Sequence, residues 1–154
     1  MDTFYAIELT NKDHHDIVEP FLEVVPSFVE HYSTFYIFSS LKDVHYIEEE
    51  LSIYSIIEMT HTIIGLSEGK YWDTFEDYGL KTNTGKAYLL NSMVKSFQII
   101  GGTEDNIKMA LLQFDEHLIA QEHTTYFVDV HHQALIEKIA NAYEVSIAFF
   151  ELDK

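Results

Sequence analysis

Segments of two kinds alternate along this chain of 154 residues, and their order limits the fold more than any other feature of the sequence. Segments rich in β-branched and aromatic residues are typical of strands, and they cover residues 3–9, 33–40, 124–130 and 144–152. Between them lie longer segments whose apolar residues recur every three or four positions. That spacing is typical of the buried face of a helix.

The longest of these periodic segments predicts a helix over residues 43–64, with Gly65 as its terminating residue. Its apolar positions at the 3.6-residue period are Val44, Ile47, Leu51, Tyr54, Ile57 and Ile64. Further helices are expected over residues 13–25, 86–100, 104–121 and 131–143.

The resulting order is strand–helix–strand, then three or four helices, then strand–helix–strand. This order predicts an α+β or α/β fold with β-α-β at both ends. We expect a single domain over residues 1–154, in which a small mixed sheet of about four strands is packed by four to six helices. A helix of about twelve residues is the usual crossover between parallel strands, so some parallel pairing is expected. The sequence shows no internal repeat.

Charge narrows the classes of partner. The chain has 26 acids, nine lysines and no arginine, which gives a net charge of −17. A field this negative repels nucleic acid and anionic lipid, and the absence of arginine removes the bidentate group that reads phosphate and guanine. No nucleic acid or membrane partner is therefore expected. The acidity serves either solubility or the binding of a basic partner protein.

The chain has no cysteine, which excludes disulfides, thiolate catalysis and iron–sulfur ligation and fits a reducing compartment. Its first residues lack the basic and apolar regions of a signal peptide. No window has the roughly 18 apolar residues of a membrane helix. We expect a cytoplasmic protein.

Residues 113–132 contain four histidines and four acids, but not at the spacing of a helical metal site. The neighbours of His117 four residues away are Gln113 and Gln121, and neither is a good ligand. Glu58 and His61 have the E-x-x-H spacing of di-iron bundle proteins, but those proteins need two such pairs. We expect no metal and no cofactor, and we interpret Glu58 and His61 as an exposed pair on a helix.

Two segments combine acids with large aromatic side chains, as protein interfaces do. We predict that they form the partner-binding surface, through Glu48, Glu49, Glu50, Tyr71, Trp72, Asp73, Glu76, Asp77 and Tyr78. Each segment has an alternative interpretation. Trp72, Phe75 and Tyr78 have the spacing of the buried face of a short helix. The three glutamates are also expected on the solvated first turns of the long predicted helix.

A small acidic protein without a catalytic motif has the profile of immunity proteins and nuclease inhibitors, whose targets carry a cationic cleft. We therefore expect a non-catalytic inhibitor or immunity-type protein that binds and neutralises a basic partner, with a nuclease toxin as the favoured class. One alternative is a small metal-dependent or acid/base enzyme that uses the long predicted helix or the turn from Asp129 to His132. Another is a structural subunit of a homo-oligomeric assembly. The oligomeric state stays open.

Overall fold

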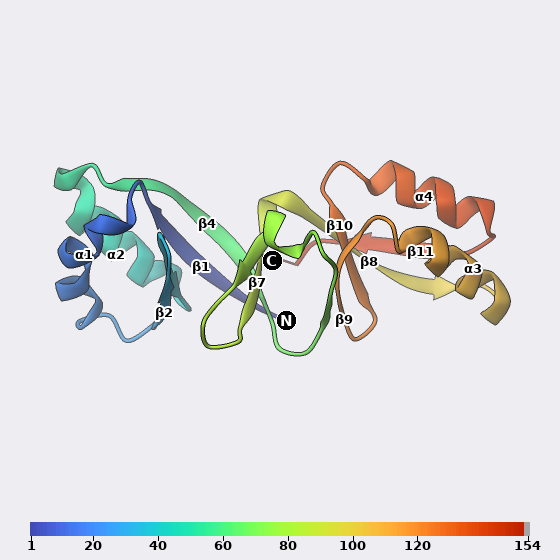
Figure 1. The fold of residues 1–154 in the computed structure, drawn as a ribbon, viewed down its shortest axis with the longest axis horizontal. Helices are drawn as coiled ribbons and strands as arrows, with labels where there is room; N and C mark the ends of the chain where they lie inside the picture. The colour runs from blue at the N-terminus through green and yellow to red at the C-terminus, as the bar shows by residue number, and fades with distance from the viewer. Residues whose placement is uncertain (153–154) are drawn as a thin grey trace.

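The computed structural model describes residues 1–152 and contains two sheets with four α-helices (Figure 1). The first part of the chain forms β1 (Asp2–Leu9), α1 (His15–Leu22), β2 (Phe28–Tyr32), β3 (Phe35–Phe38), α2 (Leu41–Leu51) and β4 (Ile57–Leu66). The middle forms β5 (Lys70–Tyr71), β6 (Gly79–Lys81) and β7 (Ala87–Leu90). The last part forms β8 (Val94–Gly101), α3 (Glu104–Phe114), β9 (Leu118–Glu122), β10 (Thr125–Asp129), α4 (Gln133–Ala142) and β11 (Ser146–Phe150). Short 3₁₀ turns cover Lys12–His14, Ser52–Tyr54, Phe75–Asp77 and Asn91–Met93.

The same six-element unit occurs twice. Residues 2–66 form β1-α1-β2-β3-α2-β4, and residues 94–150 form β8-α3-β9-β10-α4-β11. Sheet A has the strand order β2-β3-β1-β4-β7-β6, and sheet B has the order β11-β8-β10-β9-β5. Within each unit the spatial order is therefore second, third, first, fourth strand, which is the split β-α-β arrangement of ferredoxin-like folds. We call these the first and second units.

The two units also share local backbone conformations. A two-residue turn joins β2 to β3 and β9 to β10, and its first residue is left-handed in both, Ser33 with φ 54° and His123 with φ 52°. The second helix of each unit is followed by another left-handed residue, Ser55 with φ 53° or Glu144 with φ 55°. Non-glycine residues rarely adopt this conformation, so its recurrence at corresponding positions supports the duplication.

The predicted fold class, an α+β or α/β fold with one small mixed sheet of about four strands, was wrong. The described residues form two antiparallel sheets of six and five strands, and sheet A curls into a half-barrel. The β-α-β order occurs at both ends, but the two strands that flank a helix are not neighbours. β1 and β2 point the same way because both are antiparallel to β3, which lies between them. The expected parallel pairing is therefore replaced by two antiparallel pairings.

Three of the predicted helices contain strands. The helix predicted over residues 43–64 ends at Leu51, and residues 57–66 form β4. Residues 86–100 form β7 and most of β8, and residues 118–122 form β9. These strands contain apolar runs that pack on both faces, and such runs match a helical period by chance.

Each unit has its own core between its helices and its sheet. In the first unit, apolar residues of α1 and α2 pack on β1 and β3. In the second unit, α3 and α4 pack on sheet B around Phe97 and Phe114. A third cluster joins the units, because Ile64 and Leu89 of sheet A pack with Phe75 and with Phe127 of sheet B. The two units therefore share buried apolar surface.

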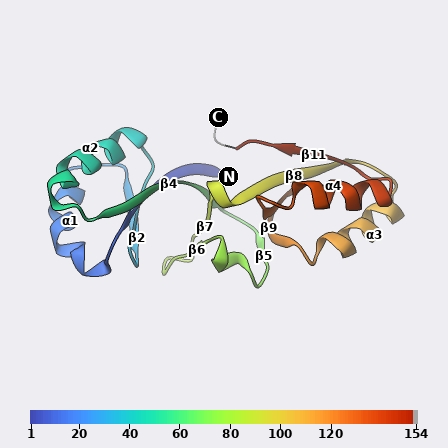
Figure 2. The same cartoon turned by 90° about the horizontal axis from the view of Figure 1, so that it is seen from above.

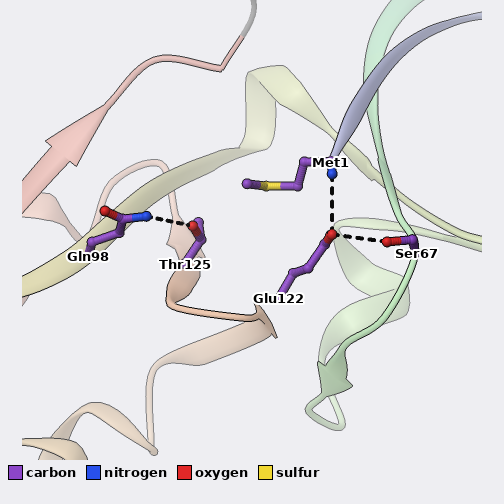
Figure 3. A network of polar contacts seen from close by, with 5 residues as sticks. All are labelled: Met1, Ser67, Gln98, Glu122 and Thr125. Carbon is purple, nitrogen blue, oxygen red and sulfur yellow. Dashed lines mark hydrogen bonds and ion pairs between the residues drawn. The ribbon is translucent and has the colours of Figure 1, made fainter.

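A polar network crosses the same junction (Figure 3). Glu122 at the end of β9 is 2 % exposed, and its Oε1 accepts a hydrogen bond of 3.2 Å from Ser67 Oγ, which follows β4. The same oxygen lies 3.2 Å from the amino group of Met1. Beside it, Gln98 Nε2 donates to Thr125 Oγ1 over 3.2 Å. A buried carboxylate with these partners fixes the end of β4 against the β9–β10 hairpin.

One hydrogen bond spans the half-barrel. The phenol of Tyr88 on β7 is buried and donates to Glu30 Oε2 on β2 over 2.8 Å, although three strands lie between them in the sheet. Thr84 Oγ1 donates to the other carboxylate oxygen of Glu30 over 2.9 Å. Ala6, Ile37 and Ile63 fill the space enclosed by this contact.

Buried tyrosines make the fold sensitive to alkali. Burial raises the pKa of Tyr36 to about 12, with smaller effects from Glu19 and Asp16, and burial together with the Glu30 hydrogen bond raises the pKa of Tyr88 further. Because both folded-state pKa values lie above the usual value of about 10, the stabilisation is complete below pH 10. It is lost as the pH rises through the folded-state values. We expect Tyr36 alone to account for about 2–3 kcal/mol between about pH 10 and pH 12.

Urea unfolding at several pH values, followed by circular dichroism, measures this loss. In the Tyr36→Phe variant the free energy of unfolding should fall less steeply over the same range, because one titrating phenol is gone. Equal slopes in the two proteins would contradict the assignment to Tyr36.

Candidate protein-binding surface

The acids are unevenly distributed over the fold. Residues 1–66 carry twelve acids and only two lysines, whereas the central residues 67–93 carry four acids and three lysines. Residues 94–154 carry ten acids and four lysines. Among the described residues, the lysine ion pairs are Lys95–Glu151 and Lys108–Glu104, both in the last part of the chain. The first unit is therefore the most acidic part of the protein and the one most attractive to a basic partner.

α2 gives this unit a distinct outer surface. Val44, Ile47 and Leu51 are buried against the sheet. On the opposite side, the spacing of three and four residues aligns Tyr46, Glu49, Glu50, Ile53 and Tyr54, which we call the α2 surface. Tyr46 is 40 % exposed, Ile53 81 % and Tyr54 45 %. Large apolar side chains next to exposed acids combine the two features of a protein interface, an anchor and a polar rim.

An open groove of about 560 Å³ borders the α2 surface. Its lining residues are Val24, Val25, Lys42, Asp43, His45, Tyr46 and Glu49. One wall is the connection from α1 to β2, which Asp43 holds by accepting a 3.3 Å hydrogen bond from the backbone N–H of Ser27. Val24 is well exposed on that wall, so the apolar part of the surface extends beyond α2.

The three predicted glutamates of α2 do not share one role. Glu49 and Glu50 are exposed on the α2 surface. Glu48 is half-buried, and its Oε2 accepts a 3.2 Å hydrogen bond from Thr60 Oγ1 on β4. Glu48 is thus directed towards the sheet.

The aromatic side chains of the second predicted segment, residues 71–78, already have partners within the protein. Trp72 Nε1 donates to Asp115 Oδ1 over 2.9 Å, and Tyr78 donates to Asp129 Oδ2 over 2.6 Å. The ring of Tyr71 lies edge-on to the buried Phe75, with centroids 4.8 Å apart. The Tyr78–Asp129 hydrogen bond raises the pKa of Tyr78 to about 12 and lowers the pKa of Asp129. These contacts agree better with a segment that packs into the protein core than with aromatic side chains that are free to contact a partner.

Charge also distinguishes the two predicted segments. Asp73, Glu76 and Asp77 are exposed, but Lys70 lies 4.6 Å from the ring centroid of Trp72 and Lys81 lies 5.2 Å from that of Tyr71. These lysines offset much of the local negative charge. The fold does not bring the segments together, since α2 lies at one end of the molecule and β5 lies near its middle (Figures 1 and 2). The geometry therefore favours the α2 surface.

No family model matches this chain. No curated protein and no solved structure is significantly similar to it either. The functional argument therefore depends on the chemistry of the surface.

The histidines form pairs that sequence spacing did not indicate. The rings of His117 and His132 meet edge-on with centroids 5.6 Å apart. Glu58 and His61 lie on strand β4 rather than on a helix, so they point to opposite faces, and His61 Nε2 instead lies 2.8 Å from Glu8 Oε1. Within residues 1–152, no group of three or more histidine and acidic side chains has the geometry to hold a metal ion.

A further cluster was missed because its members come from three elements. His15 Nδ1 on α1 lies 2.6 Å from the hydroxyl of Tyr36 on β3, and the ring of His31 on β2 stacks on both. Glu19 Oε2 lies 3.8 Å from His15 Nε2. This resembles a proton relay, but Tyr36 is fully buried, so its hydroxyl is closed to a substrate. The cluster instead ties α1 to the edge of sheet A.

One signal in the sequence pointed to the α2 surface. Tyr46 and Tyr54 flank the run of glutamates, and a helical projection places Tyr46, Glu49, Glu50 and Ile53 on one side. The periodicity argument placed Tyr54 in the core instead, because it assumed that the helix continued to residue 64.

No helix within residues 1–152 is long and apolar enough to cross a membrane.

Proposed function

We propose that this protein is a non-catalytic inhibitor that acts in the cytoplasm and neutralises a basic partner protein through the α2 surface. A nuclease toxin is the partner class that we favour. The observation that carries the proposal is the combination of exposed Tyr46, Ile53 and Tyr54 with exposed Glu49 and Glu50 on the most acidic unit. The absence of cysteine suits a reducing compartment.

The physical logic has two parts. A net charge of −17 steers a cationic partner over long distances, and this effect weakens as salt screens it. Contact then removes water from the exposed rings, which bury a large area for a small loss of side-chain entropy. Nucleases fit this surface because their substrate clefts are cationic, and an acidic protein bound there excludes the nucleic acid.

The test starts from a rescue experiment. Co-expression of this protein with the toxic products of neighbouring genes should restore growth for one product, and the purified pair should associate more slowly as salt increases. If this protein restores growth against none of the basic products, the proposal of an inhibitor loses its support.

Charge reversal on the α2 surface then locates the contact. Glu49→Lys with Glu50→Lys should weaken binding of the rescued toxin by roughly 2 kcal/mol or more, mostly through slower association, because two attractive charges become repulsive. Asp73→Lys with Glu76→Lys makes the same change of charge on the other predicted segment and should have a much smaller effect. Biolayer interferometry measures both variants. The opposite ranking would move the contact to residues 71–78.

A further inference from the structure

The two units differ at the outer edge of their fourth strand. In the first unit, β4 pairs with β1 on one side and with β7 on the other, in the register from Ile63↔Leu90 to Leu66↔Ala87. In the second unit, the corresponding strand β11 pairs, among residues 1–152, with β8 alone and is the outermost strand of sheet B (Figure 2). In the first unit, the edge of the fourth strand is therefore covered by an antiparallel strand, β7. The corresponding edge in the second unit is open to a strand of the same orientation.

The open edge borders a groove of about 490 Å³ between α4 and β11. Its lining residues are Gln133, Glu137, Ala140 and Asn141 of α4 together with Val145, Ser146, Ile147 and Phe149. Ile147 and Phe149 are half-buried and point towards the helices, where they also pack on the core of the second unit. The groove therefore lies beside the edge at the position that the side chains of an added strand would occupy.

β11 lacks the features that keep other edge strands from pairing. Natural sheets protect an exposed edge with charged residues, prolines or short strands. Edge strand β2 carries Glu30 and His31, and the edge strands β5 and β6 have only two and three residues. β11 has five residues, Ser-Ile-Ala-Phe-Phe, without a charge or a proline. Its protection is limited to a bulge beside Ser146.

We propose that β11 is a dimer edge, where a second copy of this chain adds its own β11 to form a continuous sheet through both protomers. A two-fold axis makes two copies of one strand antiparallel, as the edge requires. With the axis at Ala148, Ile147 lies opposite Phe149 of the partner subunit, on the side of α4. Such aliphatic–aromatic pairs stabilise neighbouring strands and would fill the groove.

The charges set the salt dependence of this dimer. Each chain carries −17, so two copies repel each other at long range. At the edge itself, Glu151 is paired with Lys95 over 3.4 Å, whereas Glu137 of the groove adds to the repulsion. Salt screens the remaining repulsion, and we therefore expect the dimer to become tighter as salt increases. Binding of a basic toxin at the α2 surface has the opposite salt dependence. Figure 1 shows α2 at the end of the chain away from β11, so the α2 surface of each protomer would stay free in the proposed dimer.

Sedimentation equilibrium of the purified full chain tests the proposal. The mass should rise from 17.9 kDa towards twice that value with increasing protein concentration, and more readily at high salt. Ala148→Lys should raise the dimer dissociation constant at least about tenfold, because it places two like charges opposite each other. Ala134→Lys, an exposed change of the same charge on α4, should not raise it. Both variants lower the net negative charge, so long-range repulsion cannot explain a loss of dimer.

Hydrogen exchange gives a second measurement that does not depend on a variant. Amides of residues 146–150 should become more protected at protein concentrations where the dimer forms. A chain that stays monomeric at high concentration and high salt would overturn the proposal. The proposal would also be overturned if the protein formed a dimer that neither lysine variant weakened and in which the amides of β11 stayed unprotected. Neither result bears on toxin neutralisation, which the rescue experiment tests separately.

Discussion

Replacing Phe97 with alanine should lower the free energy of unfolding by about 3–5 kcal/mol, the usual cost of truncating a fully buried phenylalanine. Phe97 lies on β8 in the core of the second unit and is fully buried. Its ring centroid is 5.4 Å from that of Phe114, 5.4 Å from that of Tyr126 and 5.2 Å from that of Phe149. Three elements meet at this ring, so no single side chain can move to fill the cavity.

Urea unfolding followed by circular dichroism and by Trp72 fluorescence measures this change. Ile100→Ala on the same strand is the matched control, because Ile100 is 65 % exposed and its truncation should alter stability by less than about 0.5 kcal/mol. We expect the two signals to change together, since the cluster around Phe75 and Phe127 is shared by both units. A loss near that of the control would mean that the core around Phe97 is less tightly packed than these contacts indicate.

Local sequence patterns placed four of the strands and two of the helices near their observed positions. The strands predicted over residues 3–9, 33–40, 124–130 and 144–152 correspond to β1, β3, β10 and β11. The helices predicted over residues 13–25 and 131–143 correspond to α1 and α4. The pattern failed in β4, β7 and β8, because their apolar residues also fall at a helical spacing, as Ile57 and Ile64 do in β4. Without alternation, only pairing partners distant in the chain separate such a strand from a helix.

The duplication was invisible for a related reason. Corresponding positions keep their conformation but not their residue, as Ser33 and His123 show in the hairpins. The buried position early in the second helix is Val44 in one unit and Ile136 in the other. A fold can retain its pattern of buried positions and turns while sequence identity disappears, and a search for repeated letters then finds nothing.

The candidate site was predictable in its charge and in the helical face that its glutamates share. The exposure of Glu49 and Glu50 follows from the helical period. The contacts of Trp72 and Tyr78 do not, because their acceptors Asp115 and Asp129 are 43 and 51 residues away. Spacing indicates which side chains share a face, whereas only the tertiary fold decides whether that face meets solvent or another part of the chain.

Phe75→Ala tests that distinction in the segment of residues 71–78. Phe75 is fully buried in the cluster that joins the two sheets, so its truncation should lower the free energy of unfolding by about 3–5 kcal/mol. The exposed neighbour Asp73 is the control, and Asp73→Ala should change stability by less than about 0.5 kcal/mol. Urea midpoints measure both variants.

Because Phe75 lies between the units, its loss should also separate their unfolding. We expect the Phe75→Ala protein to show circular dichroism and Trp72 fluorescence transitions that no longer coincide, whereas those of Phe97→Ala still coincide. Among molecules that remain folded, toxin binding should be unchanged, since the α2 surface does not contact this cluster. A Phe75→Ala protein with normal stability but impaired toxin binding would assign the segment to the partner interface rather than to the core.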